Sequence, residues 1–243
     1  MSSKLSGLLL DKCPICNTDN PDFALRCKSC GSILQQSVKT LDLFSTIYDL
    51  WRYPDFTFRK IILAEHKNYT VFMALLEGIG ISYFFMFVVK AGDIYSIDLW
   101  RLVVSGVGLA IFIFLPFLYV FSIVSYLTLR TVQTGVTLKG FISATIYGLH
   151  PVAFSAIVLL PAEVAVFGAF FFSNNPSPSV INPLPFYFLC LLDIVFVFAA
   201  FMFIAKLAKL LFGKRKFVAV FAGIFFIFLL ATMEIAKRIL VAR

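Results

Sequence analysis

Four cysteines near the amino terminus have the types and spacing of a metal site. They form two Cys-x-x-Cys pairs, Cys13 and Cys16, then Cys27 and Cys30. Each pair turns two thiolates towards one point, and two pairs complete a tetrahedral zinc site with bonds of about 2.3 Å. Because four protein ligands leave no position for substrate water, the spacing predicts a structural zinc ribbon over residues 1–31. The alternative is a pair of redox-active dithiols.

The charge of this predicted ribbon bears on its partners. Residues 1–31 hold four Lys or Arg and three Asp, and four thiolates on one Zn²⁺ add further negative charge. Modules that bind nucleic acid normally carry a basic stripe, so we expect no nucleic-acid partner. The ribbon is expected either to contact a protein through exposed Phe23 and Leu25 or only to stabilise this end of the chain.

Three ionisable residues lie inside apolar segments, namely Glu77, His150 and Asp193, with Tyr147 one helical turn before the histidine. Ionisable groups at bilayer depth are costly and often functional. One hypothesis is that Glu77, His150 and Asp193 meet to relay protons or coordinate an ion. The other is that each is a hydrogen-bonded polar pin between helices. No phosphate-binding glycine loop, HExxH or GxSxG pattern occurs, so we expect no enzyme activity.

The elements that position these residues are predicted to be membrane helices. The chain is 60% apolar and only 14% charged, with 30 Phe, whereas soluble domains are about half apolar and about a quarter charged. This composition excludes a soluble globular protein, a disordered chain and a secreted disulfide scaffold. A bilayer core of about 30 Å needs about 20 apolar residues of helix. Five segments qualify: about Tyr69–Val89, Leu102–Leu129, Phe141–Leu160, Phe186–Ala205 and Phe217–Ala236.

Prolines punctuate this predicted all-α bundle of residues 69–243. Pro116 predicts a kink or tilt in the second span. Pro161 and Glu163 interrupt the pattern after the third span. Residues 165–172 are too short to cross alone, and they are expected to be a re-entrant or interfacial piece, or part of a sixth crossing. Four prolines predict a loop over residues 173–185.

Residues 32–68 connect the ribbon to the bundle. Residues 32–40 are a polar linker, and residues 41–68 are an amphipathic segment. Its apolar residues recur at helical spacing, at Leu41, Phe44, Ile47, Tyr48 and Trp51. This pattern predicts a helix lying in the membrane interface. The alternative is a soluble helix packed on its own domain.

The positions of basic residues predict the orientation. Eleven Lys or Arg residues flank the predicted spans on the amino-terminal side, and five flank them on the other. Positive residues are retained on the cytoplasmic side, so the amino terminus is expected to be cytoplasmic and the carboxyl tail to lie across the membrane. A sixth crossing would make the tail cytoplasmic.

Residues 40–240 resemble the Yip family, five-span proteins known in eukaryotes for binding Rab-type GTPases during vesicle traffic. The stretch Tyr53-Pro54-Asp55-Phe56-Thr57-Phe58-Arg59-Lys60-Ile61 is similar to the Pro-x-x-x-Phe-basic motif before the first span of bacterial members. The segment Tyr147-Gly148-Leu149-His150-Pro151 is similar to the family's Gly-Tyr…Pro motif, with the first two residues reversed. The eukaryotic Asp-Leu-Tyr-Gly-Pro signature is absent, so Rab binding is not carried over. A preceding zinc ribbon resembles prokaryotic members.

These observations predict an integral protein of the prokaryotic cytoplasmic membrane. Its expected role is that of a non-catalytic adaptor, surrounded by lipid, whose cytoplasmic zinc ribbon contacts a protein partner. The alternative is a small-ion or proton transporter that uses Glu77, His150 and Asp193. The sequence leaves the oligomeric state open.

Overall fold

The computed structural model describes residues 12–20, 24–34, 38–130, 136–212 and 215–241. Before the membrane region lie β1 (Val38–Thr40), α1 (Leu43–Arg52), α2 (Pro54–Leu63) and β2 (Ala64–His66). The membrane region contains α3 (Thr70–Val88), α4 (Ala91–Ile94), α5 (Leu99–Leu109), η2 (Ala110–Phe114), α6 (Leu115–Arg130), α7 (Leu138–Gly148), α8 (His150–Phe154), η3 (Ser155–Leu159), α9 (Leu160–Phe167), η4 (Gly168–Phe172), α10 (Pro178–Ile181), α11 (Pro183–Phe212) and α12 (Arg215–Val241).

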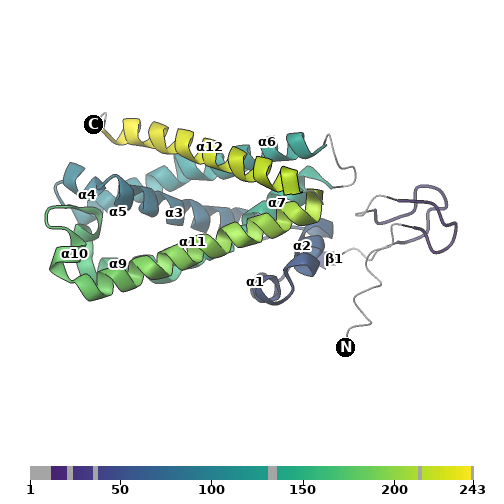
Figure 1. The fold of residues 1–243 in the computed structure, drawn as a ribbon, viewed down its shortest axis with the longest axis horizontal. Helices are drawn as coiled ribbons and strands as arrows, with labels where there is room; N and C mark the ends of the chain where they lie inside the picture. The colour runs from purple at the N-terminus through teal and green to yellow at the C-terminus, as the bar shows by residue number, and fades with distance from the viewer. Residues whose placement is uncertain (1–11, 21–23, 35–37, 131–135, 213–214, 242–243) are drawn as a thin grey trace.

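Four helical stretches are long and apolar enough to cross a membrane. They are Thr70–Val88, Leu99–Thr128, His150–Phe172 and Pro183–Leu211. By length and composition these stretches embed the chain in a bilayer, as the sequence predicts. The fifth predicted span, Phe217–Ala236, falls on α12, which runs back along α11 (Figure 1). The side chains of the first turns of α12 lie outside the described residues, so this span stays a prediction.

A π-helical turn precedes two of the prolines inside the spans. Ala110–Phe114 comes before Pro116, and Ser155–Leu159 comes before Pro161. Within an α-helix, proline lacks the N–H donor and its ring clashes with the carbonyl four residues earlier. The wider π turn relieves that clash at a local cost in geometry. The helices therefore continue through Pro116, where the sequence predicts a kink, and through Pro161, where it predicts an interruption.

The third span differs from its predicted position. The sequence predicts Phe141–Leu160, whereas the apolar helix extends over His150–Phe172 and follows α7 almost directly. It runs in the same direction as α3, because its start lies beside the middle of α3 and its last residue lies beside α4, which follows α3. A Cβ at Gly80 would lie 2.8 Å from the Val152 carbonyl oxygen, and one at Gly92 would lie 2.9 Å from that of Phe172. Residues 165–172 are thus the last part of this span.

Helix α1 turns an aromatic face outwards. Phe44, Tyr48 and Trp51 are exposed, whereas Leu50 is fully buried against the bundle. The Asp42 carboxylate accepts a hydrogen bond from the Ser45 N–H at 2.7 Å and caps the start of the helix. An outward row of aromatic residues is typical of helices at the membrane interface, and the interfacial position of this segment stays a prediction.

A short parallel pairing, which the sequence does not predict, connects the linker to the bundle. Val38 of β1 pairs with Ala64 of β2, and Thr40 pairs with His66. Because β2 comes directly before α3, the pairing holds the end of the linker next to the entry of the first span. In Figure 1 the cysteine segment lies at this end of the bundle, and the end of α12 lies at the opposite one.

Helix α3 is the most buried of the four spans and contacts α5 closely. The Ser82 hydroxyl donates to the Gly106 carbonyl at 2.7 Å, and the Tyr83 hydroxyl donates to the Val103 carbonyl at 2.9 Å. A Cβ at Gly106 would lie 2.5 Å from the Tyr83 ring. Small residues allow membrane helices to approach this closely, and the approach places α3 at the centre of the bundle.

Candidate functional site

Two knuckles of the same construction carry the four cysteines. The Asn17 N–H donates to the Cys13 carbonyl at 2.9 Å, and the Gly31 N–H donates to the Cys27 carbonyl at 3.0 Å. Asn17 and Gly31 have φ angles of +58° and +72°, in the left-handed region. Glycine and, less readily, asparagine tolerate this conformation. The left-handed residue after each second cysteine closes a turn that directs both sulfurs of the pair to one side.

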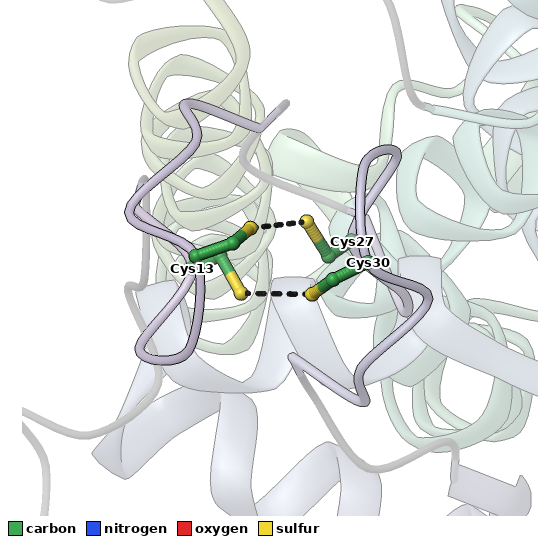
Figure 2. Close-up of side chains that lie close together, drawn as sticks. Cys13, Cys27 and Cys30 are labelled. Carbon is green, nitrogen blue, oxygen red and sulfur yellow. Dashed lines mark hydrogen bonds between the residues drawn. The ribbon is translucent and has the colours of Figure 1, made fainter.

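The four sulfur atoms form one cluster at the meeting of the knuckles. All four Sγ atoms lie within 4.8 Å of one another. The shortest separations, both 3.5 Å, join Cys13 to Cys30 and Cys16 to Cys27, across the knuckles (Figure 2). A redox Cys-x-x-Cys needs only the two sulfurs of one pair to meet. The approach of all four, each a free thiol, instead suits tetrahedral metal binding, in which sulfurs lie about 3.8 Å apart.

Polar side chains surround this cluster and join its two halves. The Asn20 side chain is buried, and its amide donates to the Thr18 carbonyl at 2.7 Å and to the Cys27 Sγ at 3.6 Å. Its Oδ1 atom accepts from the Lys28 N–H at 2.9 Å. Hydrogen bonds of this kind orient the ligands of metal sites. Asn20 was not predicted from the sequence, although its position between the two Cys-x-x-Cys pairs is a usable signal.

Ser32 favours the metal-binding form of one cysteine. Its Oγ lies 3.1 Å from the Cys13 Sγ, and this hydrogen bond is the main reason that the pKa of Cys13 falls to about 6. Backbone hydrogen bonds around Cys27 lower the pKa of that thiol as well. Thiolates are the species that bind metals, so the cluster is chemically suited to a thiophilic cation.

Glu77 is fully buried on α3, yet neither carboxyl oxygen has a hydrogen-bond partner among the described residues. The next residue, Gly78, brings the backbone of α3 close to η2: a Cβ there would lie 3.2 Å from the Ala110 carbonyl oxygen. Among the described residues, Glu77 therefore makes no hydrogen bond of the kind that the polar-pin hypothesis requires. A buried polar group left without a partner costs about 1–3 kcal/mol.

Replacing Glu77 with Met is consequently expected to stabilise the purified protein by about 1–3 kcal/mol, because the change removes an unsatisfied carboxyl at similar volume. The measurement is the midpoint of thermal unfolding in detergent micelles. Glu77→Gln is the matched control, since it keeps a polar group in the same place and should gain less. A clear loss of stability in Glu77→Met would contradict this description of the site.

His150 lies in an aromatic environment at the junction of α7 and α8. Its Nδ1 donates to the Tyr147 carbonyl at 2.8 Å, and its ring packs 4.7 Å from the Phe203 ring and 5.6 Å from the Trp51 ring, centroid to centroid. The Nε2 atom of His150 and the Tyr147 hydroxyl have no hydrogen-bond partner among the described residues. The helix break at Leu149 leaves the Tyr147 carbonyl available as an acceptor. The hydrogen bond to this carbonyl explains how the His150 ring is oriented.

Asp193, on α11, contacts a different set of residues. Its Oδ1 accepts a hydrogen bond from the Ser155 hydroxyl at 2.6 Å, and its side chain lines the same cavity as Glu163. Among the described side chains, no hydrogen bond or ion pair joins Glu77, His150 and Asp193. The structure thus places Asp193 at one cavity with Glu163, a residue that the sequence pattern marks only as an interruption after the third predicted span. Their separation of 30 positions gave no local signal of this arrangement.

Comparison of the chain with known protein families, curated proteins and solved structures finds no match. The resemblance to the Yip family rests on the two motifs described above and remains an expectation.

Proposed function

We propose that this chain is a non-catalytic membrane adaptor, in which the helical bundle anchors a zinc-stabilised cysteine module that binds a protein partner. The observation that carries the proposal is the cluster of four cysteine sulfurs within 4.8 Å of one another. A metal bound there would have four protein ligands and no open position, which is the arrangement of structural rather than catalytic zinc.

Zinc is the metal that this donor set favours. Four thiolates in tetrahedral arrangement suit Zn²⁺ or an iron–sulfur centre. The short sulfur–sulfur separations of 3.5 Å leave room for one ion rather than for a cluster with bridging sulfides. The ligands would be Cys13, Cys16, Cys27 and Cys30, and the metal would supply stability to a module with little core of its own.

The proposed cytoplasmic side is the end of the bundle that carries the cysteine module. Basic residues approach one another there: burial lowers the pKa of Lys67, and the nearby ammonium of Lys139 lowers it further. Lys60 forms an ion pair with Asp49 at 3.4 Å at the same end. Retention of positive residues on the cytoplasmic side supports this orientation, and the resemblance to prokaryotic Yip proteins supports a location in the prokaryotic cytoplasmic membrane.

The proposed partner-binding surface consists of Ile15 and Ile33. These side chains are 75% and 68% exposed on the module. The sequence predicts that Phe23 and Leu25 are exposed. Leu25 is 37% exposed, and Phe23 lies outside the described residues. Exposed aliphatic side chains beside a rigid metal-held turn are suited to contact with a protein.

Chemical crosslinking in membranes, followed by pull-down of the full chain, tests the adaptor function. We expect a discrete partner whose yield falls about tenfold or more when Ile15 and Ile33 are both changed to Glu, because desolvated apolar contacts dominate such interfaces. The metal content of that variant should stay at the level of the unmodified chain.

Val180→Glu provides the matched control, since Val180 is 76% exposed on α10 at the other end of the bundle (Figure 1). Its partner yield should not change. Removal of residues 1–31, or Cys13→Ser combined with Cys27→Ser, should abolish capture. Unchanged capture in either of these two variants would refute the adaptor function.

A further inference from the structure

A cavity of about 470 Å³ lies between α3, α9 and α11, within the membrane region. This volume is in the range of small-molecule sites, which is about 300–1,000 Å³. Much of its wall is aromatic, formed by Tyr83, Phe84, Phe87, Phe171, Phe198 and Phe201. Ser155, Glu163 and Asp193 bring polar groups into this apolar surface. Convergence of a few polar groups in a largely apolar pocket is typical of ligand sites.

The two carboxyl groups give the cavity an unbalanced charge. Glu163 is only 3% exposed, and its Oε1 has no hydrogen-bond partner among the described residues. Asp193 lines the same cavity and accepts the hydrogen bond from Ser155. No Lys, Arg or His side chain lies among the described residues that line the cavity, so no basic group on its wall offsets the two carboxyl groups.

The described basic side chains do not neutralise this pair. The ion pairs found within the described residues are those of Asp49, Asp98 and Glu234. Lys90, at the end of α3, places its ammonium over the Phe87 ring, 3.9 Å from the centroid. Carboxyl groups beside aromatic faces are matched by a cation, because the carboxyl oxygens and the rings both attract positive charge.

The lining of the site indicates that the rest of the ligand is apolar. A second cavity of about 470 Å³, between α3, α8, α11 and α12, shares Gly80, Phe84, Ser155, Asp193, Val197 and Phe201 with the first. Its other lining residues are apolar. Phe84, Ile194 and Phe198, on the rim of the first cavity, are exposed on the surface of the bundle. A ligand with an apolar body would therefore reach the carboxyl pair from the bilayer.

We propose that this cavity binds a lipophilic monocation, with its positive group at Glu163 and Asp193 and its apolar body along the shared wall of the two cavities. A hydrated metal ion would leave most of the apolar wall without a contact, and a neutral lipid would leave the carboxyl charge unmatched. The inference does not depend on the cysteine module, so failure of the proposed adaptor function would leave it intact.

Binding of radiolabelled tetraphenylphosphonium to the full chain in phosphatidylcholine nanodiscs tests the proposal. We expect saturable binding at one site per chain. Glu163→Gln and Asp193→Asn should each weaken it about tenfold or more, since each replaces a carboxyl group that faces the cation with a neutral amide of nearly the same shape. Tetraphenylborate, which has the same shape and the opposite charge, should not displace the bound cation at equal concentration.

Two further variants separate a lost site from a misfolded protein. Val197→Trp fills the wall shared by both cavities without touching the charge, and it should abolish saturable binding. Glu77→Gln alters a buried carboxyl outside both cavities and should bind as the unmodified chain does. Absence of saturable binding in the unmodified chain, equal binding in Glu163→Gln, or displacement by tetraphenylborate would overturn the proposal.

Discussion

Chelation of the metal is expected to unfold the cysteine module and leave the helical bundle folded. The described apolar core of the module contains only Cys13, Cys27 and Leu34, with Ala24 packed against it. So small a core cannot offset the loss of chain entropy on folding. A structural zinc ion contributes about 10–16 kcal/mol in small domains of this kind, and the fold of the module should depend on it.

Limited trypsin digestion of the full chain in detergent micelles provides the measurement. Cleavage after Arg26 and Lys28 should become at least about a hundredfold faster once a strong chelator is present, because the opened module is populated far more often. The elution volume of the remaining helical bundle should not change. Equal protection with and without chelator would contradict the metal-dependent fold.

Substitution of a single ligand should have nearly the same result as chelation. Cys27→Ser replaces a buried ligand, and the metal content of the purified chain should fall from one ion to less than about a tenth. Cys190→Ser is the control, because Cys190 is a half-buried free thiol on α11, outside the module. A full complement of metal in Cys27→Ser would show that the four sulfurs do not act together.

The second large effect is expected at Gly80, where α3 passes α8. A Cβ at this position would lie 2.8 Å from the Val152 carbonyl oxygen and 2.9 Å from its Cγ1. Because a backbone oxygen cannot rotate aside, Gly80→Ala must push the two helices apart. We expect a loss of about 1–3 kcal/mol in the free energy of unfolding, as for other overpacked interiors. Unfolding by a denaturing detergent, titrated into mild micelles, measures this loss.

Gly108→Ala is the matched control on a neighbouring helix. A Cβ at Gly108 would meet no atom within 4 Å. Alanine also loses less conformational freedom than glycine on entering a helix, so this variant should be more stable by about 0.5–1 kcal/mol. Opposite signs for the two substitutions would establish that the close approach of α3 and α8, rather than helix propensity, limits the stability of the bundle.

The prolines separate what sequence pattern predicts well from what it predicts poorly. Long apolar segments are local properties, and the four described spans coincide with predicted ones, although the third is displaced. Its later start follows from the break between α7 and α8, and its later end from Pro161, where the sequence pattern predicts an interruption. The π turn at Ser155–Leu159 accommodates it. Whether a helix can widen by one residue depends on the helices against which it packs. The sequence pattern of one segment does not identify those neighbouring helices.

The cluster of four cysteines was determined almost entirely by the sequence. Two short turns place the sulfurs of each pair, so the spacing predicted the cluster, although it did not reveal Asn20. For the intramembrane residues, the sequence did not determine which side chains come together. Glu163 and Asp193 come from separate spans, and only the packing of α9 against α11 brings them to one cavity while Glu77 and His150 lie elsewhere. Local spacing determines a site built from turns, whereas a site built between helices is decided by their packing, which depends on contacts distant in the chain.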